Sequence, residues 1–169
     1  NSGIIHAGYN ALENTLKGQL NVKAAPMFDK ICTDLKVPFH RVGSLVVGFT
    51  DEDLKKIKEE KARGEKYGIK GLEIIEKKAL HRIEPNLHKE AKYALFAPQA
   101  GIISPYELTI AFADNAVMNG VNVLLKTEAN DLVTESGRVK GVITNNGTIG
   151  CRIVVNAAGL FAGKIAAMA

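Results

Sequence analysis

Small residues that follow an apolar run could hold a ligand near the end of the chain. The apolar run 153–155 is predicted as the end of a strand, Ala157, Ala158 and Gly159 follow closely, and a helix then opens. Small side chains let a ligand approach the backbone, and the amino end of a helix favours a phosphate group. In open α/β sheets, ligands lie beyond the carboxyl ends of the strands. The alternative is that these residues only let the helix pack closely against the strand.

The first nine residues have the same character. They read NSGIIHAGY, which combines small residues with one serine and one histidine. A loop of this kind can press its backbone against a flat ring, and His6 could move a proton near neutral pH. The alternative is an ordinary loop in which His6 is structural.

Polar residues elsewhere give weaker signals. Arg41 and Ser44, on a predicted strand, could face a polar ligand, although one of them could equally point to solvent. The sequence contains no Gly-x-Ser-x-Gly, Walker-type or Gly-x-Gly-x-x-Gly motif. No metal site is predicted, because the remaining histidines lack ligand spacing: His40, His81 and His88.

The first half of the chain must position these residues with alternating helices and strands. Apolar residues spaced by three and four predict one helix over 12–35, weakened by Gly18. A strand is predicted over 39–49, and Thr50 with an acid three residues later predicts a capped helix to about Tyr67. The shorter predicted elements are a strand at 72–75, a helix at 77–83, and strands at 93–96 and 102–103.

The second half begins with the clearest local signal. Ser104, Pro105 and Glu107 match the N-cap, first and third positions of a helix, which predicts a capping box, and the helix is predicted to end at Gly120. Strands are predicted at 121–125 and 151–155, and a hairpin between them pairs 131–135 with 138–144. This mixture of helices and strands predicts an α/β or α+β fold.

Composition fits a globular protein and limits its partners. The 169 residues suit one domain or two small lobes, with 46% hydrophobic and 24% charged residues. The net charge of +4 could indicate a basic module for an anionic partner, but the basic stretch 55–70 alternates Lys with Glu and is predicted as a solvated helix face. We therefore expect no nucleic-acid binding. Two distant cysteines predict a reducing, cytoplasmic compartment.

The order of the motifs resembles one enzyme family. NSGIIHAGY is similar to the segment after the first βαβ unit in FAD-dependent oxidoreductases of the D-amino-acid-oxidase-like superfamily. VPFHRVGSLVVGF resembles the first long strand of their substrate domain, and LFAPQAGIISPYELTIAFADNAVMNGVNVLLKTEANDL resembles the return to the FAD domain. CRIVVNAAGLFA is similar to their second flavin-contacting turn. Within the superfamily, the likeness is greatest to glycerol-3-phosphate dehydrogenases and L-2-hydroxyglutarate oxidases.

The resemblance implies a role for each turn. Residues near the isoalloxazine of FAD would be Ser2, Gly3, His6, Ala7 and Gly8. Ala129 would offer its backbone to the adenine, while Ala157, Ala158 and Gly159 would approach the ribityl-diphosphate region. Substrate carbon would give hydride to the flavin while a base, with His6 as the candidate, takes the hydroxyl proton. Both turns are thus expected to line one flat ring.

The resemblance also implies an internal piece of a longer protein. The predicted parts are 1–36 for a flavin-contacting loop and helix, 37–100 for the substrate lobe, and 101–169 for part of the FAD-binding domain. The family's dinucleotide fingerprint is expected upstream and its cationic substrate groups downstream, so the piece alone should bind FAD weakly or not at all. The substrate would be a small hydroxy compound, and the parent could also meet a membrane surface or an electron acceptor. A domain with this fold but no chemistry is the remaining alternative.

Overall fold

The computed structural model describes residues 2–12 and 14–169. Contacts divide the chain after Gly120 into two compact units, and each is described by itself. No helix in the described part of the chain has the length and apolar character that crossing a membrane requires. The two units are defined by contacts and not by function, so the roles predicted for residues 1–36, 37–100 and 101–169 stay predictions.

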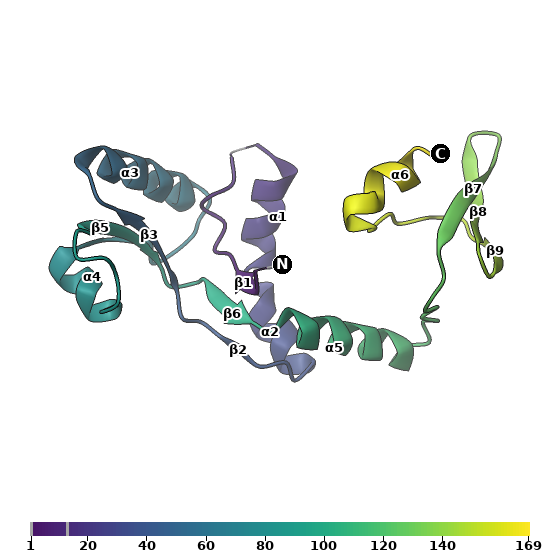
Figure 1. The fold of residues 1–169 in the computed structure, drawn as a ribbon, viewed down its shortest axis with the longest axis horizontal. Helices are drawn as coiled ribbons and strands as arrows, with labels where there is room; N and C mark the ends of the chain where they lie inside the picture. The colour runs from purple at the N-terminus through teal and green to yellow at the C-terminus, as the bar shows by residue number, and fades with distance from the viewer. Residues whose placement is uncertain (1, 13) are drawn as a thin grey trace. The chain divides into compact units, whose positions relative to one another are not determined.

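The first unit contains two small antiparallel sheets (Figure 1). One sheet has the order β1-β6-β2, and the other has the order β3-β5-β4. The strands are β1 (Ile4–Ile5), β2 (Phe39–His40), β3 (Ser44–Gly48), β4 (Glu73–Glu76), β5 (Tyr93–Ala97) and β6 (Gly101–Ile103). The helices are α1 (Leu16–Ala24), α2 (Met27–Asp34), α3 (Asp51–Lys66), α4 (Lys77–Ile83) and α5 (Pro105–Met118).

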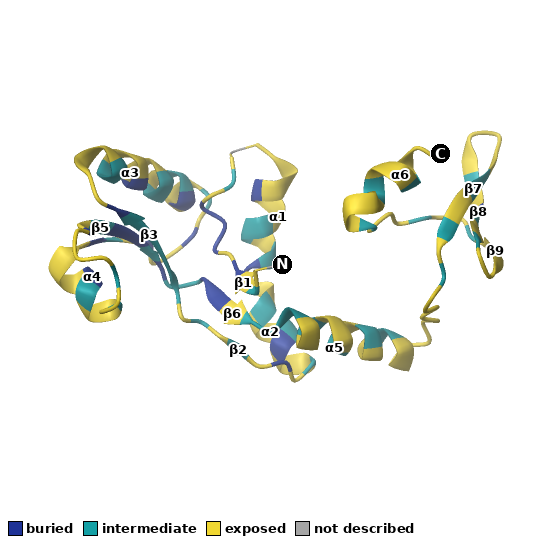
Figure 2. Cartoon of the chain, in the orientation of Figure 1, coloured by how far each residue is buried: buried dark blue, intermediate teal, exposed yellow. Residues whose placement is uncertain are grey.

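The core of this unit lies on both faces of the sheet that contains β5. Leu95 and Ala97 pack with Ile57 of α3, whereas Ala94 packs with Leu80 of α4. Successive side chains of a strand point to opposite faces, so α3 and α4 cover opposite sides, as Figure 1 also shows. Figure 2 shows the buried residues gathered on these strands and the exposed ones on the outer sides of the two helices.

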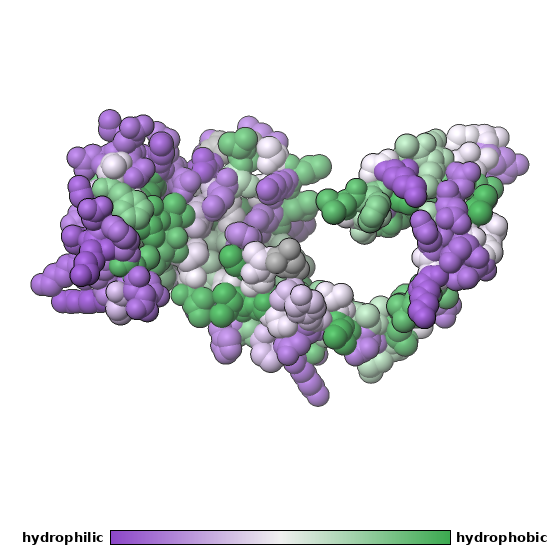
Figure 3. Space-filling view, viewed as in Figure 1, coloured by the Kyte–Doolittle hydropathy of each residue, from purple (hydrophilic) through white to green (hydrophobic). Residues whose placement is uncertain are grey.

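The predicted capping box of α3 and the predicted N-cap of α5 are confirmed. Asp53 N donates to Thr50 Oγ1 at 3.1 Å while Thr50 N donates to Asp53 Oδ2 at 3.0 Å, which completes a capping box. Ser104 Oγ accepts from Glu107 N at 3.3 Å at the start of α5. The outer face of α3 carries exposed lysines and glutamates, and Figure 3 shows hydrophilic side chains over this part of the surface. The predicted solvated face therefore exists.

Two predicted elements of the first unit are each divided in the structure. The helix expected over 12–35 is two helices, because Pro26 lacks the backbone N–H that would continue α1 and instead precedes α2. The strand expected over 39–49 is β2 and β3, which belong to different sheets. Gly43, at φ +77°, turns the backbone between them, and an added Cβ would collide with the Phe96 ring.

The second unit is a β-meander followed by a short helix. Strands β7 (Ala129–Glu135), β8 (Arg138–Thr144) and β9 (Gly147–Gly150) pair antiparallel in that order. The predicted hairpin is confirmed, and its turn places Ser136 at φ +50° and Gly137 at φ +71°. A 3-10 turn, η1 (Gly159–Phe161), leads into α6 (Ala162–Ala166).

The strands predicted at 121–125 and 151–155 are wrong for this structure. Neither segment is assigned as a strand among the described residues, although Cys151 N donates to Lys140 O of β8 at 2.9 Å. Their apolar side chains are largely exposed, with Leu125 at 80% and Val155 at 85%. A β-strand exists only where a neighbour completes its hydrogen bonds, so apolar sequence alone is insufficient here.

Candidate functional site

The loop after β1 exposes His6 and buries its neighbours. Ile4 pairs with Ile102 of β6, which anchors the start of the loop. The His6 side chain is exposed, whereas Ala7 and Tyr9 are only 3% and 4% exposed. The sequence therefore forms a loop with a fixed underside and one ionisable side chain on its open side.

Two glycines set the course of the backbone on either side of β1. Gly3 has φ +66°, and its carbonyl accepts a hydrogen bond from Ile103 N at 2.9 Å. Gly8 has φ +106°, and an added Cβ would lie 2.7 Å from Val22 Cγ2 on α1. Both positions lie in the left-handed region that favours glycine. Gly8 therefore lets the loop lie directly against α1, while Ser2 lies exposed ahead of β1.

His6 lines two cavities that also share Asn21 of α1. One has a volume of about 140 Å³ and includes Gly8 and Lys17 in its lining. The other has a volume of about 190 Å³ and includes Ile5 and Ala24. The structure thus places the predicted proton-handling histidine beside space that a small group could enter.

The second small-residue turn is shaped by Asn156. Its Oδ1 accepts from Ala158 N at 3.2 Å, and its Nδ2 donates to Ala162 O at 2.8 Å. Gly159 has φ +55°, and no atom lies within 4 Å of where its Cβ would be. Ala157 and Gly159 are exposed. The turn therefore presents backbone with open space in front of it.

Ala129 and Ala158 line one cavity of about 380 Å³ within the second unit. The resemblance assigned both residues to FAD binding, and the structure brings them together from positions far apart in the sequence. The rest of the lining combines polar and apolar side chains: Thr127, Glu128, Phe161, Lys164 and Ile165. Lys164 Nζ lies 3.8 Å from Glu128 Oε1. This size falls within the range of about 300–1,000 Å³ that small-molecule sites occupy.

The edge of this cavity is held by two asparagines that sequence reasoning treated only as a turn. Asn145 Oδ1 accepts from Glu128 N at 2.8 Å, and Asn145 Nδ2 donates to Lys126 O at 3.1 Å. Asn146 Nδ2 donates to Thr127 Oγ1 at 3.0 Å. The Asn-Asn-Gly signal was visible in the sequence, but its partners lie about twenty residues away, so their contact was not.

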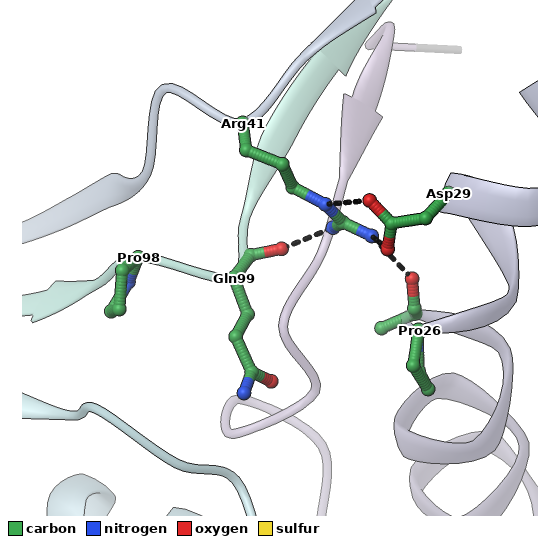
Figure 4. Close-up of a pocket in the computed structure, with 6 residues that line it drawn as sticks. Pro26, Asp29, Arg41, Pro98 and Gln99 are labelled. Carbon is green, nitrogen blue, oxygen red and sulfur yellow. Dashed lines mark hydrogen bonds and ion pairs between the residues drawn. The ribbon is translucent and has the colours of Figure 1, made fainter.

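Arg41, predicted as a substrate contact, joins three segments of the first unit (Figure 4). Its Nη2 donates to Asp29 Oδ2 and to Ala25 O, both at 2.8 Å, and its Nη1 donates to Gln99 O. These groups line a cavity of about 310 Å³. The hydrogen bonds from Arg41 hold the pKa of the Asp29 carboxyl below its usual value. The guanidinium therefore has a structural role that needs no ligand.

Ser44, the other predicted substrate contact, pairs with a buried tyrosine. Its Oγ lies 3.1 Å from Tyr9 Oη, which ties β3 to the His6 loop. Burial raises the pKa of Tyr9, the hydrogen bond with Ser44 opposes the rise, and the charge of Glu60 adds to it. Tyr9 is therefore a neutral phenol at physiological pH. The ligand roles predicted for Arg41 and Ser44 stay predictions.

The residues present fit a dinucleotide such as FAD. Gly159 leaves open space where a side chain would stand, and the Ala129–Ala158 cavity offers apolar walls for a ring and polar groups at its edge. His6 belongs to the first unit and Gly159 to the second, so their meeting on one ring stays a prediction. No cluster of three or more His, Cys, Asp or Glu side chains suited to a metal ion occurs over residues 2–12 and 14–169.

Known proteins resemble this chain over nearly all of its length. It is 46% identical over 165 residues to a glycerol 3-phosphate dehydrogenase of Caloramator mitchellensis, and 28% identical over 179 residues to a mitochondrial L-2-hydroxyglutarate dehydrogenase of Nematostella vectensis. Each alignment covers 98% of this chain, but only 34% and 39% of those proteins. The chain therefore spans between a third and two fifths of these relatives.

Solved structures show the same fold. An L-proline dehydrogenase from P. horikoshii matches with a TM-score of 0.86 and 29% identity, covering 93% of this chain and 42% of that one. An L-alpha-glycerophosphate oxidase from Mycoplasma pneumoniae, solved with FAD bound, matches with a TM-score of 0.88 and 24% identity, covering 100% and 46%. The family model described as FAD dependent oxidoreductase matches residues 1–169. The chain belongs to the family of FAD-dependent oxidoreductases.

Proposed function

We propose that the protein containing this chain is an FAD-dependent dehydrogenase that oxidises the secondary alcohol of a glycerol-3-phosphate-like substrate. The observation that carries the proposal is the 46% identity to a glycerol 3-phosphate dehydrogenase over 98% of the chain, against 28% for the L-2-hydroxyglutarate relative. The geometry supports it with two small-residue turns, each beside a cavity. The substrate, acceptor and remaining site groups belong to the whole protein.

The two turns would hold different parts of the cofactor. The loop formed by Ser2, Gly3, Ala7 and Gly8 would lie against the isoalloxazine, as its small residues and buried underside allow. In the second unit, the cavity beside Ala129 would take the adenosine end. The backbone of Ala157, Ala158 and Gly159 would face the chain that links it to the ring, because open space lies in front of Gly159.

His6 would handle the proton of the substrate hydroxyl. Its imidazole is exposed and borders two cavities, so a hydroxyl group could reach a ring nitrogen. A histidine side chain within hydrogen-bond reach of a hydroxyl can act as a general base. When bound, the flavin would supply the acceptor for the hydride. Asn21, which borders both cavities, would limit the space beside the imidazole.

An L-2-hydroxyglutarate-type substrate is the second candidate, favoured by the L-2-hydroxyglutarate dehydrogenases among the relatives. Both substrates carry a secondary hydroxyl beside anionic groups, so the chemistry at His6 would be the same. They differ in the anion, which is a phosphate in one and carboxylates in the other. Reoxidation of the flavin would require an electron acceptor. We also propose that the protein is cytoplasmic, with or without peripheral contact to a membrane.

Steady-state kinetics on the full-length protein test this proposal. Each substrate would be supplied with a dye as electron acceptor, for the parent protein, His6→Gln and the control His88→Gln, an exposed histidine between α4 and β5. We expect glycerol 3-phosphate to give the higher kcat/KM. His6→Gln should lower kcat by about 10²–10⁴-fold with flavin content unchanged, because general base catalysis contributes that much. Equal activity of His6→Gln and the parent, or no turnover of either substrate, would refute the assignment.

A further inference from the structure

The C-terminal half of α3 presents one face to the loop that follows His6. Glu60, Arg63, Gly64 and Tyr67 are spaced by three, four and seven residues, which places them on the same side of a helix. This face is distinct from the solvated lysine and glutamate face on the same helix. Helix α3 therefore has a second surface whose polar groups are directed inward.

Two side chains on this face donate hydrogen bonds to backbone carbonyls of the loop. Arg63 Nε donates to Tyr9 O at 2.8 Å, across 54 residues of sequence. At the C-cap of α3, Tyr67 Oη donates to Leu12 O at 3.1 Å. These bonds fix the path of the backbone itself, so they constrain the residues that precede Tyr9, including Gly8 and His6.

The helix approaches the loop closely because residue 64 is glycine. Gly64 is buried, and a Cβ added there would lie 3.1 Å from Tyr9 Cβ and would also collide with Leu72. A side chain at this position would collide with the Leu72 side chain and crowd Tyr9. The contact between α3 and the loop therefore has two independent features, which are the absence of a side chain at Gly64 and the hydrogen bond from Arg63 Nε to Tyr9 O.

Glu60 and Ser44 complete the arrangement around Tyr9. Glu60 Oε1 lies 3.9 Å from Arg63 Nη2, which places a negative charge beside the guanidinium, and the buried Glu60 Oε2 has no hydrogen-bond partner in the described structure. On the other side, Tyr9 Oη bonds to Ser44 Oγ of β3 at 3.1 Å. Tyr9 is thus bonded at two points: its carbonyl accepts a hydrogen bond from Arg63 of α3, and its hydroxyl bonds to Ser44 of β3.

We propose that Arg63 is a positioning residue that holds the His6–Gly8 loop in the conformation that binds flavin. The inference rests on the proposed function for the flavin itself. Arg63 does not touch the ligand but acts through the Tyr9 carbonyl, one residue after Gly8. Hydrogen bonds from a charged donor are about twice as strong as neutral ones.

The test compares variants of the full-length protein. Arg63→Ala removes the donor, Arg63→Lys keeps the charge, and Arg82→Ala is the control because Arg82 is an exposed arginine on α4. Flavin absorbance gives the dissociation constant of FAD for the apoprotein, hydrogen exchange reports the loop amides, and thermal unfolding reports stability. Kinetics with substrate separate kcat from KM.

Arg63→Ala should raise the FAD dissociation constant by about tenfold to a hundredfold, the range for losing a hydrogen bond from a charged group. Amides of residues 6–12 should exchange faster, while those of β5 should not change. Arg63→Lys should recover part of the affinity, and Arg82→Ala should match the parent. Should Arg63→Ala fail to fold, Tyr67→Phe removes a single hydroxyl from the same face and should raise the constant several-fold, about as for a neutral hydrogen bond.

Unchanged loop exchange in Arg63→Ala would overturn the proposal. Faster exchange with unchanged FAD affinity and kcat would also overturn it, because the contact would then be structural only. An unsubstituted full-length protein that binds no FAD would refute the proposed function and the positioning role that rests on it. Exchange in Arg63→Ala would still show in that case whether Arg63 holds the loop, so the two failures are distinguishable.

Discussion

Replacing Gly8 with alanine tests the close packing of the His6 loop against α1. An alanine at φ +106° must adopt a left-handed backbone conformation, which costs about 1–2 kcal/mol for a residue with a Cβ. Its Cβ would also lie 2.7 Å from Val22 Cγ2, 3.2 Å from Val22 N and 3.3 Å from Val22 Cα. A β-branched side chain has few alternative rotamers, and backbone atoms cannot move aside.

Overpacking of this kind costs about 1–3 kcal/mol, so Gly8→Ala should lower the free energy of unfolding by roughly 2–5 kcal/mol in total. Gly68→Ala is the matched control in the same unit. Gly68 has φ +78°, but no atom lies within 4 Å of where its Cβ would be. The control should therefore lose only the backbone contribution of about 1–2 kcal/mol.

Urea unfolding followed by far-ultraviolet circular dichroism measures both variants. The chain contains no tryptophan, so the backbone signal is more suitable than intrinsic fluorescence. The difference between the variants should be about 1–3 kcal/mol, which is the contribution of the contact with Val22. If Gly8→Ala is no less stable than Gly68→Ala, the loop does not lie against α1 as described.

Three further predictions concern charge, a buried hydroxyl and the second cavity. The pKa of Asp29 is lowered in the folded state, so its contribution to stability is present above about pH 4 and is lost as the pH falls through the folded pKa. Asp29→Asn should therefore make stability less dependent on pH in this acid range, as measured by a circular dichroism titration. Ser44→Ala should cost about 1–3 kcal/mol in urea unfolding because it leaves the Tyr9 hydroxyl unpaired, whereas Tyr9→Phe should cost only about 0.5–1.5 kcal/mol; a reversed order would contradict the pairing. Ala158→Leu should weaken FAD binding to the full-length protein by about tenfold to a hundredfold, measured by flavin absorbance, because overpacking costs about 1–3 kcal/mol; unchanged affinity would place the cofactor elsewhere.

Local signals in the sequence predicted most elements of the fold. The caps at Thr50 and Ser104 involve residues three apart, and the turn at Ser136 joins adjacent strands, so neighbouring residues contain the necessary information. The break at Pro26 was equally local, and apolar periodicity concealed it. Strand pairing is not local. The segments 121–125 and 151–155 have strand-like composition but belong to none of the sheets formed by the described residues.

The candidate site was predictable in its residue types and less so in its contacts. Small residues and His6 suggested ligand-binding turns, and the resemblance to a family assigned Ala129 and Ala158 to the same cofactor before the structure placed them in one cavity. Arg41 shows the limit, because an arginine that binds an anion and one that binds Asp29 have the same sequence signal. Arg63 was assigned to a solvated face, since its partner carbonyl lies 54 residues away.

A structure of the full-length protein with FAD bound would show where each turn lies relative to the cofactor. We propose that the His6–Gly8 loop and the turn at Gly159 each contact the flavin, while the adenosine end lies in the cavity beside Ala129. We predict atoms of both turns within about 4 Å of the cofactor, which is ordinary van der Waals contact. A bound flavin that touches only one of the turns, or an adenine that lies away from Ala129, would contradict the account.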